Sequence, residues 1–433
     1  MGLLELALLL LVLLVFLLGA GLWVALALAG VGYVAMVLVH PSPGLFLASA
    51  YWEGVSSWTL AALPMFIWMG EILFRTRLSN ELFSGIAPWV RRLPGRLLHV
   101  NIFACGLFGC VSGSSAATCA TVSKIALPEL QKRGYSEQVA IGSLATAGTL
   151  GLLLPPSIIM VVYAVAAEVS IIRIFIAGFV PGLLVIVLFS LYIAVWALLN
   201  PARQPAPEPR LSFGRKLRAS AQLIPCVLLI IGVIGSMLGG IATATEAAAC
   251  GVLGSLILAA ATGGLSWRSF VDSLAGATRL SCMILFILAG AAFLTKAMAL
   301  TGIPAALAGA VAEAGLSPYA IIAILTLVYI VMGMALDGVS MIVLTTSVVV
   351  PMVTAAGFDL IWFGIFIILL VEIGQVTPPV GFNLFVMQSM TGKEQLEVAW
   401  AALPFFLMLV LAVLLITLFP PIVTWLPDLL LSR

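Results

Sequence analysis

The sequence predicts an all-α polytopic membrane protein made of two inverted-topology repeats, each with one re-entrant helical hairpin and one discontinuous helix. Three observations support this fold class. Hydrophobic residues make up 63% of the 433 residues and charged residues only 8%, far below the roughly 25% of a soluble domain. Apolar runs of membrane-spanning length recur from end to end and are interrupted twice, at matched spacing, by a Gly/Ser or Asp-Gly tip and a Pro-Pro break. The corresponding loops of the two halves differ sharply in their content of Lys and Arg.

Composition excludes several functional classes. The six cysteines lie in apolar surroundings without a CxxC pair, and His40 and His99 are the only histidines. Neither a disulfide framework, nor a His/Cys metal cluster, nor a His-based catalytic triad is therefore expected. The sequence contains no nucleotide-binding loop. We expect no enzymatic activity, no organic cofactor and no nucleic-acid partner. The apolar composition requires a lipid bilayer around the protein.

The first repeat is assigned to residues 1–200. Its apolar start, 3–39, is interrupted at Gly19–Gly21, which suits two helices or one broken helix. This start lacks a basic n-region and carries Glu5, so we interpret it as a retained helix rather than a signal peptide. The next expected span covers 51–74, and these elements would form scaffold helices.

The middle of the first repeat holds the first irregular pair. We predict hairpin 1 at about 97–127, because Ser-Gly-Ser-Ser at its centre leaves two arms that are each too short to cross a bilayer. A broken helix is expected at 137–170, where Pro155-Pro156 interrupts an apolar run. Irregular backbone at membrane depth must line a protein cavity, where its polar groups find partners. A span at 171–199 completes the first repeat.

A Pro-rich, basic linker at 201–220 precedes the second repeat, 221–433, in which the same order of elements recurs. Hairpin 2 is predicted at about 319–353, and the second broken helix at 361–390. The spacing from Ser115 to Pro155 and the spacing from Gly338 to Pro378 are both 40 residues. Scaffold spans are expected at 224–238, 241–261, 277–298 and 399–419.

Loop charge indicates that the two copies are inverted. Segments 75–99 and 124–133 hold eight Lys and Arg residues, whereas their counterparts at 296–320 and 345–356 hold only Lys296. Because cytoplasmic loops are enriched in Lys and Arg, corresponding loops should lie on opposite faces, with the linker cytoplasmic and both termini periplasmic. Inverted repeats with discontinuous helices are typical of secondary transporters. The alternative is a non-transporting scaffold subunit with incidental proline kinks.

The tips and breaks contain the candidate ion ligands. In the first repeat, the hydroxyls of Ser112 and Ser115 join carbonyls near Gly151 and Leu154, which are freed because Pro155 and the proline after it have no N–H to donate. The second repeat offers the same kinds of group at Gly333, Gly374, Thr377 and Val380. Oxygen ligands of this type suit a hard monovalent cation. The alternative is that these small residues serve close helix packing.

The candidate substrate-contacting residues are Ser114 and Gly338 at the two tips, together with Asp337 and Lys296. A carboxylate at membrane depth is a functional-site hypothesis by default. Asp337 would either bind a hydroxyl or ammonium group of the substrate or cap the helix that begins at Gly338. Lys296 would either attract an anionic substrate or extend to the interface. Glu246 is interpreted as an interhelical hydrogen-bonding residue rather than a proton carrier.

The motifs resemble those of the large membrane subunit of the tripartite ATP-independent periplasmic (TRAP) transporters, the DctM-like M subunit. One position departs from the family pattern, because Ala244 stands where the second-half motif has a proline, which alters a helix start. The matching segments, which extend over nearly the whole chain, are 113–117, 127–130, 134–135, 150–157, 239–248 and 374–381.

The resemblance implies a sodium-coupled importer of small organic acids in the bacterial inner membrane, driven by an ion gradient. It implies an elevator-type fold like that of the ion-transporter superfamily. The partners would be a periplasmic substrate-binding protein (P, DctP-like) and a small four-helix membrane subunit (Q, DctQ-like), which we expect to be a separate polypeptide. A proton-coupled or other elevator-family anion transporter is the alternative. By resemblance, one sodium site comprises Ser112, Ser115, Gly151, Leu154 and Pro156, and the other Gly333, Gly374, Thr377 and Val380.

Overall fold

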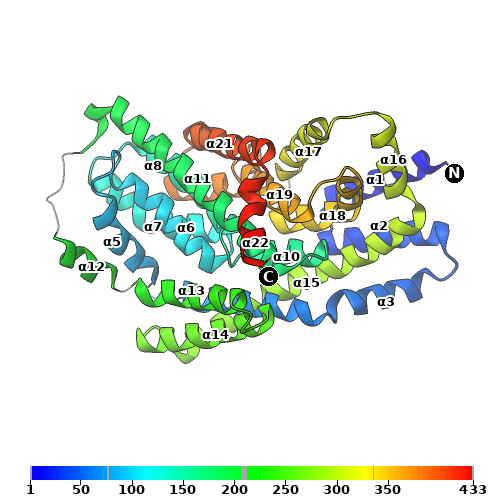
Figure 1. The fold of residues 1–433 in the computed structure, drawn as a ribbon, viewed down its shortest axis with the longest axis horizontal. Helices are drawn as coiled ribbons and strands as arrows, with labels where there is room; N and C mark the ends of the chain where they lie inside the picture. Colours follow the sequence, from blue (N-terminus) through cyan, green and yellow to red (C-terminus); the bar gives the residue numbers. More distant parts are fainter. Residues whose placement is uncertain (1, 76–77, 206–211, 222, 335, 432–433) are drawn as a thin grey trace.

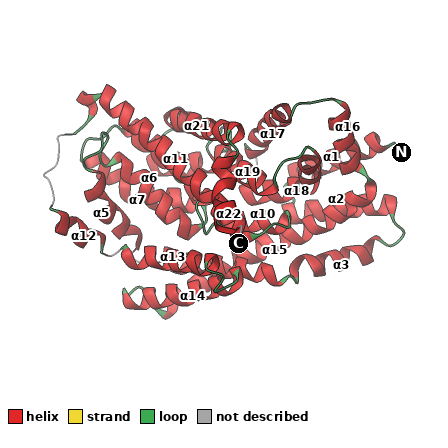
Figure 2. Ribbon diagram, in the orientation of Figure 1, coloured by secondary structure: helices red, strands yellow, loops and turns green. Residues whose placement is uncertain are grey.

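The computed structural model describes residues 2–75, 78–205, 212–221, 223–334 and 336–431, and these are helical with short connections and contain no strand (Figure 2). Five of the helices in these ranges are long and apolar enough to cross a membrane, or up to eight if three bent pairs each count as one span. The expected all-α, multi-span architecture is confirmed. Residues 206–211 of the predicted linker lie outside the described residues.

The order of the helices follows the two halves of the sequence. The first half contains α1 (Leu3–Gly19), α2 (Val24–Val39), α3 (Pro43–Val55), the short η1 (Trp58–Ala61), α4 (Ala62–Phe74), α5 (Leu78–Val90), α6 (Leu98–Ser112), α7 (Ser115–Lys132), α8 (Glu137–Ala147), α9 (Leu150–Leu153), α10 (Ile158–Ala166) and α11 (Ile171–Leu199). After η2 (Pro201–Arg203) come α12 (Phe213–Ser220), α13 (Ile224–Leu238), α14 (Ala244–Ala261), α15 (Trp267–Thr301), α16 (Ile303–Glu313), α17 (Pro318–Gly333), α18 (Gly338–Ala355), α19 (Leu360–Gln375), α20 (Phe382–Thr391), α21 (Gln395–Leu418) and α22 (Pro421–Leu431).

The long helix α15 is the spine of one layer, in which it runs beside α2 and α3 (Figure 1). Small residues allow this close packing. A Cβ on Gly32 of α2 would lie 2.9 Å from the ring of Phe293, and a Cβ on Gly290 of α15 would lie 2.6 Å from the carbonyl oxygen of Ala25. Helices α4, α13 and α14 extend the same layer at its other end (Figure 1).

The second layer holds two helix–turn–helix pairs and two broken helices. The pair α6/α7 turns at Gly113, whose φ of +58° favours glycine. The pair α17/α18 lies on the other side of the centre from α6/α7 in Figure 1, with α19 between the two pairs. The segments α8–α9 and α10 are bent by 45° around Pro155-Pro156, and α19 ends before Pro378-Pro379. Both Pro-Pro bonds are cis.

Helix α19 is the centre of the second layer, because every residue from Ile361 to Gln375 is buried. Its contacts reach α17, α18, α21, α11 and α10. A helix that is apolar all round belongs in the middle of a protein rather than at a lipid-facing surface. Helix α19 therefore packs directly on the pair α17/α18 and reaches the pair α6/α7 through α9.

Three sequence-based expectations need correction. The expected span at 51–74 is two helices, α3 and α4, bent by 53° at the short η1. The residues between the expected runs 3–39 and 51–74 are not a loop throughout, because Pro43 is the first residue of α3, where its missing N–H costs nothing. The linker contains the amphipathic helix α12, and α16 and α22 were not expected, because they are short and lie beside stronger apolar runs.

Glu246 is also placed differently from the expectation. Its carboxylate accepts hydrogen bonds from the N–H and the hydroxyl of Thr243, each at 2.8 Å, and so closes a capping box at the start of α14. The expected interhelical bond is therefore wrong. Ala244 is the first residue of α14, a position at which proline is favoured but alanine is tolerated.

Candidate functional site

The two hairpin tips meet at one cavity of about 200 Å³. Hairpin 1 contributes 113–116 and hairpin 2 contributes 337–339, although the two tips are more than 200 residues apart in sequence. The remaining lining comes from the two broken helices and from the spine helix α15, namely Leu152, Ile158, Ile159, Gln375, Phe382, Leu280, Met283 and Ile284. Pockets for drug-sized ligands begin near 300 Å³, so this cavity suits only a small molecule.

Four helices begin at the wall of this cavity. Ser115, Ile158, Gly338 and Phe382 are the first residues of α7, α10, α18 and α20, and all four line it. The first turn of a helix carries N–H groups without intrahelical partners and a positive dipole end, and both attract anions. The helices that precede them, α6, α9, α17 and α19, end with free carbonyls of opposite sign. The site therefore offers positive and negative backbone ends side by side.

Asn383, which our sequence analysis missed, holds the tip of hairpin 1 in place. The Ser115 hydroxyl donates to Asn383 Oδ1 at 2.9 Å, and Asn383 Nδ2 donates to the carbonyl of Ala145 at 2.8 Å. The side chain of Asn383 is fully buried. One residue of α20 therefore ties hairpin 1 to the first broken helix. An isolated Asn two residues after Pro-Pro-Val-Gly, in an otherwise apolar run, was the available signal.

The first predicted ion group lies where hairpin 1 packs on the break between α9 and α10. A Cβ on Gly109 of α6 would lie 2.4 Å from the Cα of Gly151, so the two backbones touch. Pro155 cannot donate to the Gly151 carbonyl, and the Leu152 carbonyl, freed in the same way, accepts the Ser157 hydroxyl at 2.7 Å. Helices α6 and α7 both contact α9, but the Ser112 hydroxyl is hydrogen-bonded to the Thr118 hydroxyl, at 2.6 Å. The members of this group lie at the tip, Ser112 and Ser115, and at the break, Gly151, Leu154 and Pro156.

The second predicted ion group repeats this arrangement. A Cβ on Gly333 of α17 would lie 2.7 Å from the Cα of Gly374 in α19. The Thr377 hydroxyl donates to the Ile373 carbonyl at 2.7 Å, which leaves its lone pairs available. The Val380 carbonyl accepts from Gln395 Nε2 at 2.6 Å, a partner that the sequence did not reveal. Gly333 and Gly374 therefore allow close packing, as the alternative interpretation holds, and their carbonyls lie beside the break.

Asp337 caps α18, which was one of its two expected roles. Its carboxylate accepts from the N–H groups of Val339 and Ser340 at 3.1 and 3.2 Å, and also from the Ser340 hydroxyl. It is the only charged side chain that lines the tip cavity within the described ranges. A Cβ on Gly338 would lie 2.4 Å from Val371 Cγ1, so tip 2 is pressed against α19. Ser114 caps α7 in the same position of tip 1, where its hydroxyl accepts from the Ala117 N–H at 3.4 Å.

Lys296 does not line the tip cavity. Its ammonium forms an ion pair with Glu53 of α3, and both residues line a second, polar cavity of about 510 Å³. This second cavity lies between α3 and α15 on one side and α10 and α18 on the other. The structure thus separates Lys296 from the three other candidate substrate-contacting residues, which it brings together.

Glu372, on α19, is a fully buried carboxylate two residues before Gly374. Neither of its oxygens has a hydrogen-bond partner. The hydroxyl of the neighbouring Thr149 donates instead to the Thr146 carbonyl at 2.8 Å. A buried carboxyl without partners is costly in its charged form, so this side chain stands out from the rest of the core.

Comparison with known proteins gives consistent results. The family described as "Tripartite ATP-independent periplasmic transporter, DctM component" matches residues 9–422. The chain is 32% identical over 402 residues to the C4-dicarboxylate TRAP transporter large permease protein DctM of Pseudomonas aeruginosa, with 92% of each chain covered. It is 33% identical over 386 residues to the ectoine/5-hydroxyectoine TRAP transporter large permease protein UehC of Ruegeria pomeroyi, with 88% of each covered.

A solved structure shares the fold. The YdaH transporter of Alcanivorax borkumensis superposes with a TM-score of 0.61 at 15% identity, covering 92% of this chain and 98% of that one. At this identity the likeness concerns the fold alone. The family match, together with relatives above 30% identity along almost the full length, establishes the family. This multi-pass membrane protein belongs to the DctM family of TRAP transporter large permeases.

Proposed function

We propose that this protein is the substrate-conducting subunit of a sodium-coupled importer for a small organic acid. The observation that carries the proposal is the cavity between the hairpin tips, onto which the first residues of α7, α10, α18 and α20 converge. Helix starts of this kind bind the anionic groups of substrates in secondary transporters, and the adjoining unwound carbonyls bind the coupling ions. The two predicted ion groups lie at those carbonyl ends.

The lining of the cavity supports a substrate class. A carboxylate or sulfonate would lie against the N–H groups of the helix starts, and a hydroxyl or ammonium group would face Asp337. The names of two relatives, one for C4-dicarboxylates and one for ectoines, agree with small polar acids and zwitterions. The small volume of the cavity favours a compact molecule of this kind.

An elevator motion accounts for the two layers. The hairpins and broken helices would move as one body along a scaffold that includes α2, α3, α4 and α13 to α15. The moving body would meet α15 through Leu280, Met283 and Ile284, whose apolar side chains form no directional bond that must break during sliding. The hairpins would then be re-entrant, and the two halves would be inverted copies, as their loop charge indicates.

The protein would work in the bacterial inner membrane with two partners. A periplasmic substrate-binding protein would deliver the acid, and a small four-helix membrane subunit would complete the scaffold. Membership of a tripartite family supports both partners. Sodium and substrate transport would be coupled through the ordering of the tip. Sodium bound between tip and break would order the tip, and only an ordered tip would close over the substrate.

Transport into proteoliposomes tests the proposal. The chain would be reconstituted with its small subunit, and uptake of substrate from the loaded binding protein would be measured against sodium concentration. Ser115→Ala and Thr377→Ala should each raise the sodium concentration for half-maximal uptake. Ser255→Ala is the matched control, because that buried hydroxyl bonds only within the scaffold helix α14, to the Val252 carbonyl. An unchanged sodium dependence in both site variants would refute the ion-site assignment.

Proton coupling is the second candidate, and Glu372 is the observation in its favour. A buried carboxyl with no partner could carry a proton in place of an ion. Uptake in sodium-free buffer over a range of pH separates the two mechanisms. Sodium-independent uptake that is lost in Glu372→Gln would favour proton coupling over sodium coupling. If no uptake occurred with all components present, the chain would instead be a scaffold subunit.

A further inference from the structure

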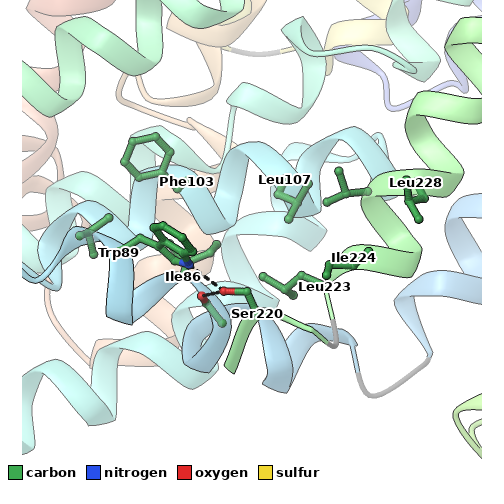
Figure 3. A pocket seen from close by; sticks show the side chains of 11 residues that line it. Ile86, Trp89, Phe103, Leu107, Ser220, Leu223, Ile224 and Leu228 are labelled. Carbon is green, nitrogen blue, oxygen red and sulfur yellow. Dashed lines mark hydrogen bonds between the residues drawn. The ribbon is translucent and has the colours of Figure 1, made fainter. Parts of the chain in front are cut away.

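An apolar groove of about 500 Å³, lined by other residues than the tip cavity, lies between α5, α6 and the start of α13. Figure 3 shows Trp89, Phe103 and Leu107 on one side of it and Leu223 and Leu228 on the other. The groove opens outward, because Trp89 is 43% exposed and Leu228 is 61% exposed. Its lining is almost entirely carbon, which suits a hydrocarbon chain.

Specific contacts build this groove at one end. The Trp89 indole N–H donates to the Ser220 hydroxyl at 2.7 Å, and that hydroxyl donates to the Gly85 carbonyl at 2.8 Å (Figure 3). Gly85 lies close to Leu223, since a Cβ there would lie 2.6 Å from Leu223 Cδ1 and would displace that side chain. Helix α5 is thus locked to the junction of α12 and α13, and the groove has a fixed floor.

Positive charge gathers at the same end. Helix α12 carries Arg215, Lys216 and Arg218, with the exposed apolar residues Phe213 and Leu217 one helical turn apart. Lys216 Nζ lies 5.4 Å from the centre of the Trp89 ring, which places a cation at the mouth of the groove. Within the described residues, no carboxylate pairs with Lys216 or Arg218. A short basic amphipathic helix of this kind lies in the membrane interface.

We propose that the groove binds one anionic phospholipid, with an acyl chain against Phe103, Leu107 and Leu228 and the phosphate held by Lys216 at the mouth, while Arg218 of the same helix adds a second interfacial cation. The complementary charge at the mouth and the carbon lining together select this occupant. Basic pockets beside spanning helices on the cytoplasmic side bind anionic head groups. The lipid would contact both α6, the first arm of hairpin 1, and the scaffold helix α13.

Native mass spectrometry of the full chain in mild detergent tests this site without measuring transport. Phosphatidylglycerol and phosphatidylcholine with identical acyl chains serve as probes. One phosphatidylglycerol should be retained in preference to phosphatidylcholine. The double variant Lys216→Gln/Arg218→Gln should lower the affinity for phosphatidylglycerol by about 30-fold, from two interfacial cations, while Leu228→Trp should fill the groove and reduce retention of both lipids.

Two matched control variants test whether the effect depends on where the charge is removed or the side chain is enlarged. Arg268→Gln removes a cation that is 92% exposed at the start of α15, and Leu253→Trp enlarges an outward-facing residue of α14; both should retain phosphatidylglycerol as the wild type does. Equal retention of the two lipids by the wild type would overturn the proposal. So would undiminished retention by the double variant, or a co-purifying protein helix that occupies the groove instead of lipid.

Discussion

The most informative single substitution is Asn383→Leu, which keeps the volume of the side chain and removes its polar atoms. Asn383 links the Ser115 hydroxyl, at 2.9 Å, to the Ala145 carbonyl, at 2.8 Å. The substitution leaves a buried hydroxyl and a buried carbonyl without these partners. Each such group costs about 1–3 kcal/mol, so the expected loss of stability is roughly 2–6 kcal/mol.

Part of this cost falls on the tip of hairpin 1. If sodium binding must order that tip, a loss of about 2 kcal/mol there raises the sodium concentration for half-maximal uptake by roughly 30-fold. The measurement is uptake into proteoliposomes across a sodium titration, with thermal unfolding followed in sodium and in potassium. The stabilisation that sodium confers on the wild type should shrink in the variant.

Asn101→Leu is the matched control. Asn101 is equally buried in the same body and bonds to Ser143 at 2.8 Å, but it lies ten residues or more before the tip. It should lower the unfolding temperature and leave the sodium dependence within about twofold of the wild type, because it contacts neither the tip nor the break. A folded Asn383→Leu protein with unchanged sodium dependence would refute the link between tip order and ion binding.

Three further predictions follow from the same geometry. Gly109→Ala and Gly333→Ala should each destabilise the protein by about 1–3 kcal/mol in thermal unfolding, because the new Cβ would meet backbone atoms. Gly235→Ala is the control: no atom lies within 4 Å of the new Cβ, so it should stabilise helix α13 by up to about 1 kcal/mol. Asp337→Asn should keep the helix cap and the unfolding temperature, and weaker uptake would show that the charge itself faces the substrate. Lys296→Gln should leave the substrate concentration for half-maximal uptake within about threefold, because a half-exposed ion pair contributes about 1 kcal/mol or less; a tenfold increase would place Lys296 on the substrate path.

The irregular elements were the most predictable part of the fold. Pro155-Pro156 and Pro378-Pro379 cannot donate the hydrogen bonds of a continuing helix, so the breaks were fixed by chemistry local to the sequence. The tips followed from Gly and Ser within apolar runs, and the turn at Gly113, with its positive φ, agrees with this. Such features depend on neighbouring residues alone.

The misplaced features depend on contacts between distant segments. Asn383 gains its importance from Ser115, 268 residues away, and Lys296 lies outside the tip cavity, paired with Glu53, 243 residues away. No local pattern encodes either partner. The bend between α3 and α4 was missed for another reason: Ser56 and Ser57 interrupt the run, and the only nearby breaker, Gly54, was not interpreted as a break.

The chain's low charge is compatible with carrying an ionic cargo because broken helices supply charge from the backbone. Each break exposes a carbonyl end and an N–H end, equivalent to about half an elementary charge of either sign. Full charges at membrane depth are expensive, and Asp337, the carboxylate that lines the cavity within the described residues, accepts hydrogen bonds from the N–H groups that it caps. An anion at the N–H ends and cations at the carbonyl ends would bind to peptide groups of the same short turns. Ordering those turns for one ligand would therefore prepare them for the other, and the proposed coupling would follow from the continuity of the backbone across each break.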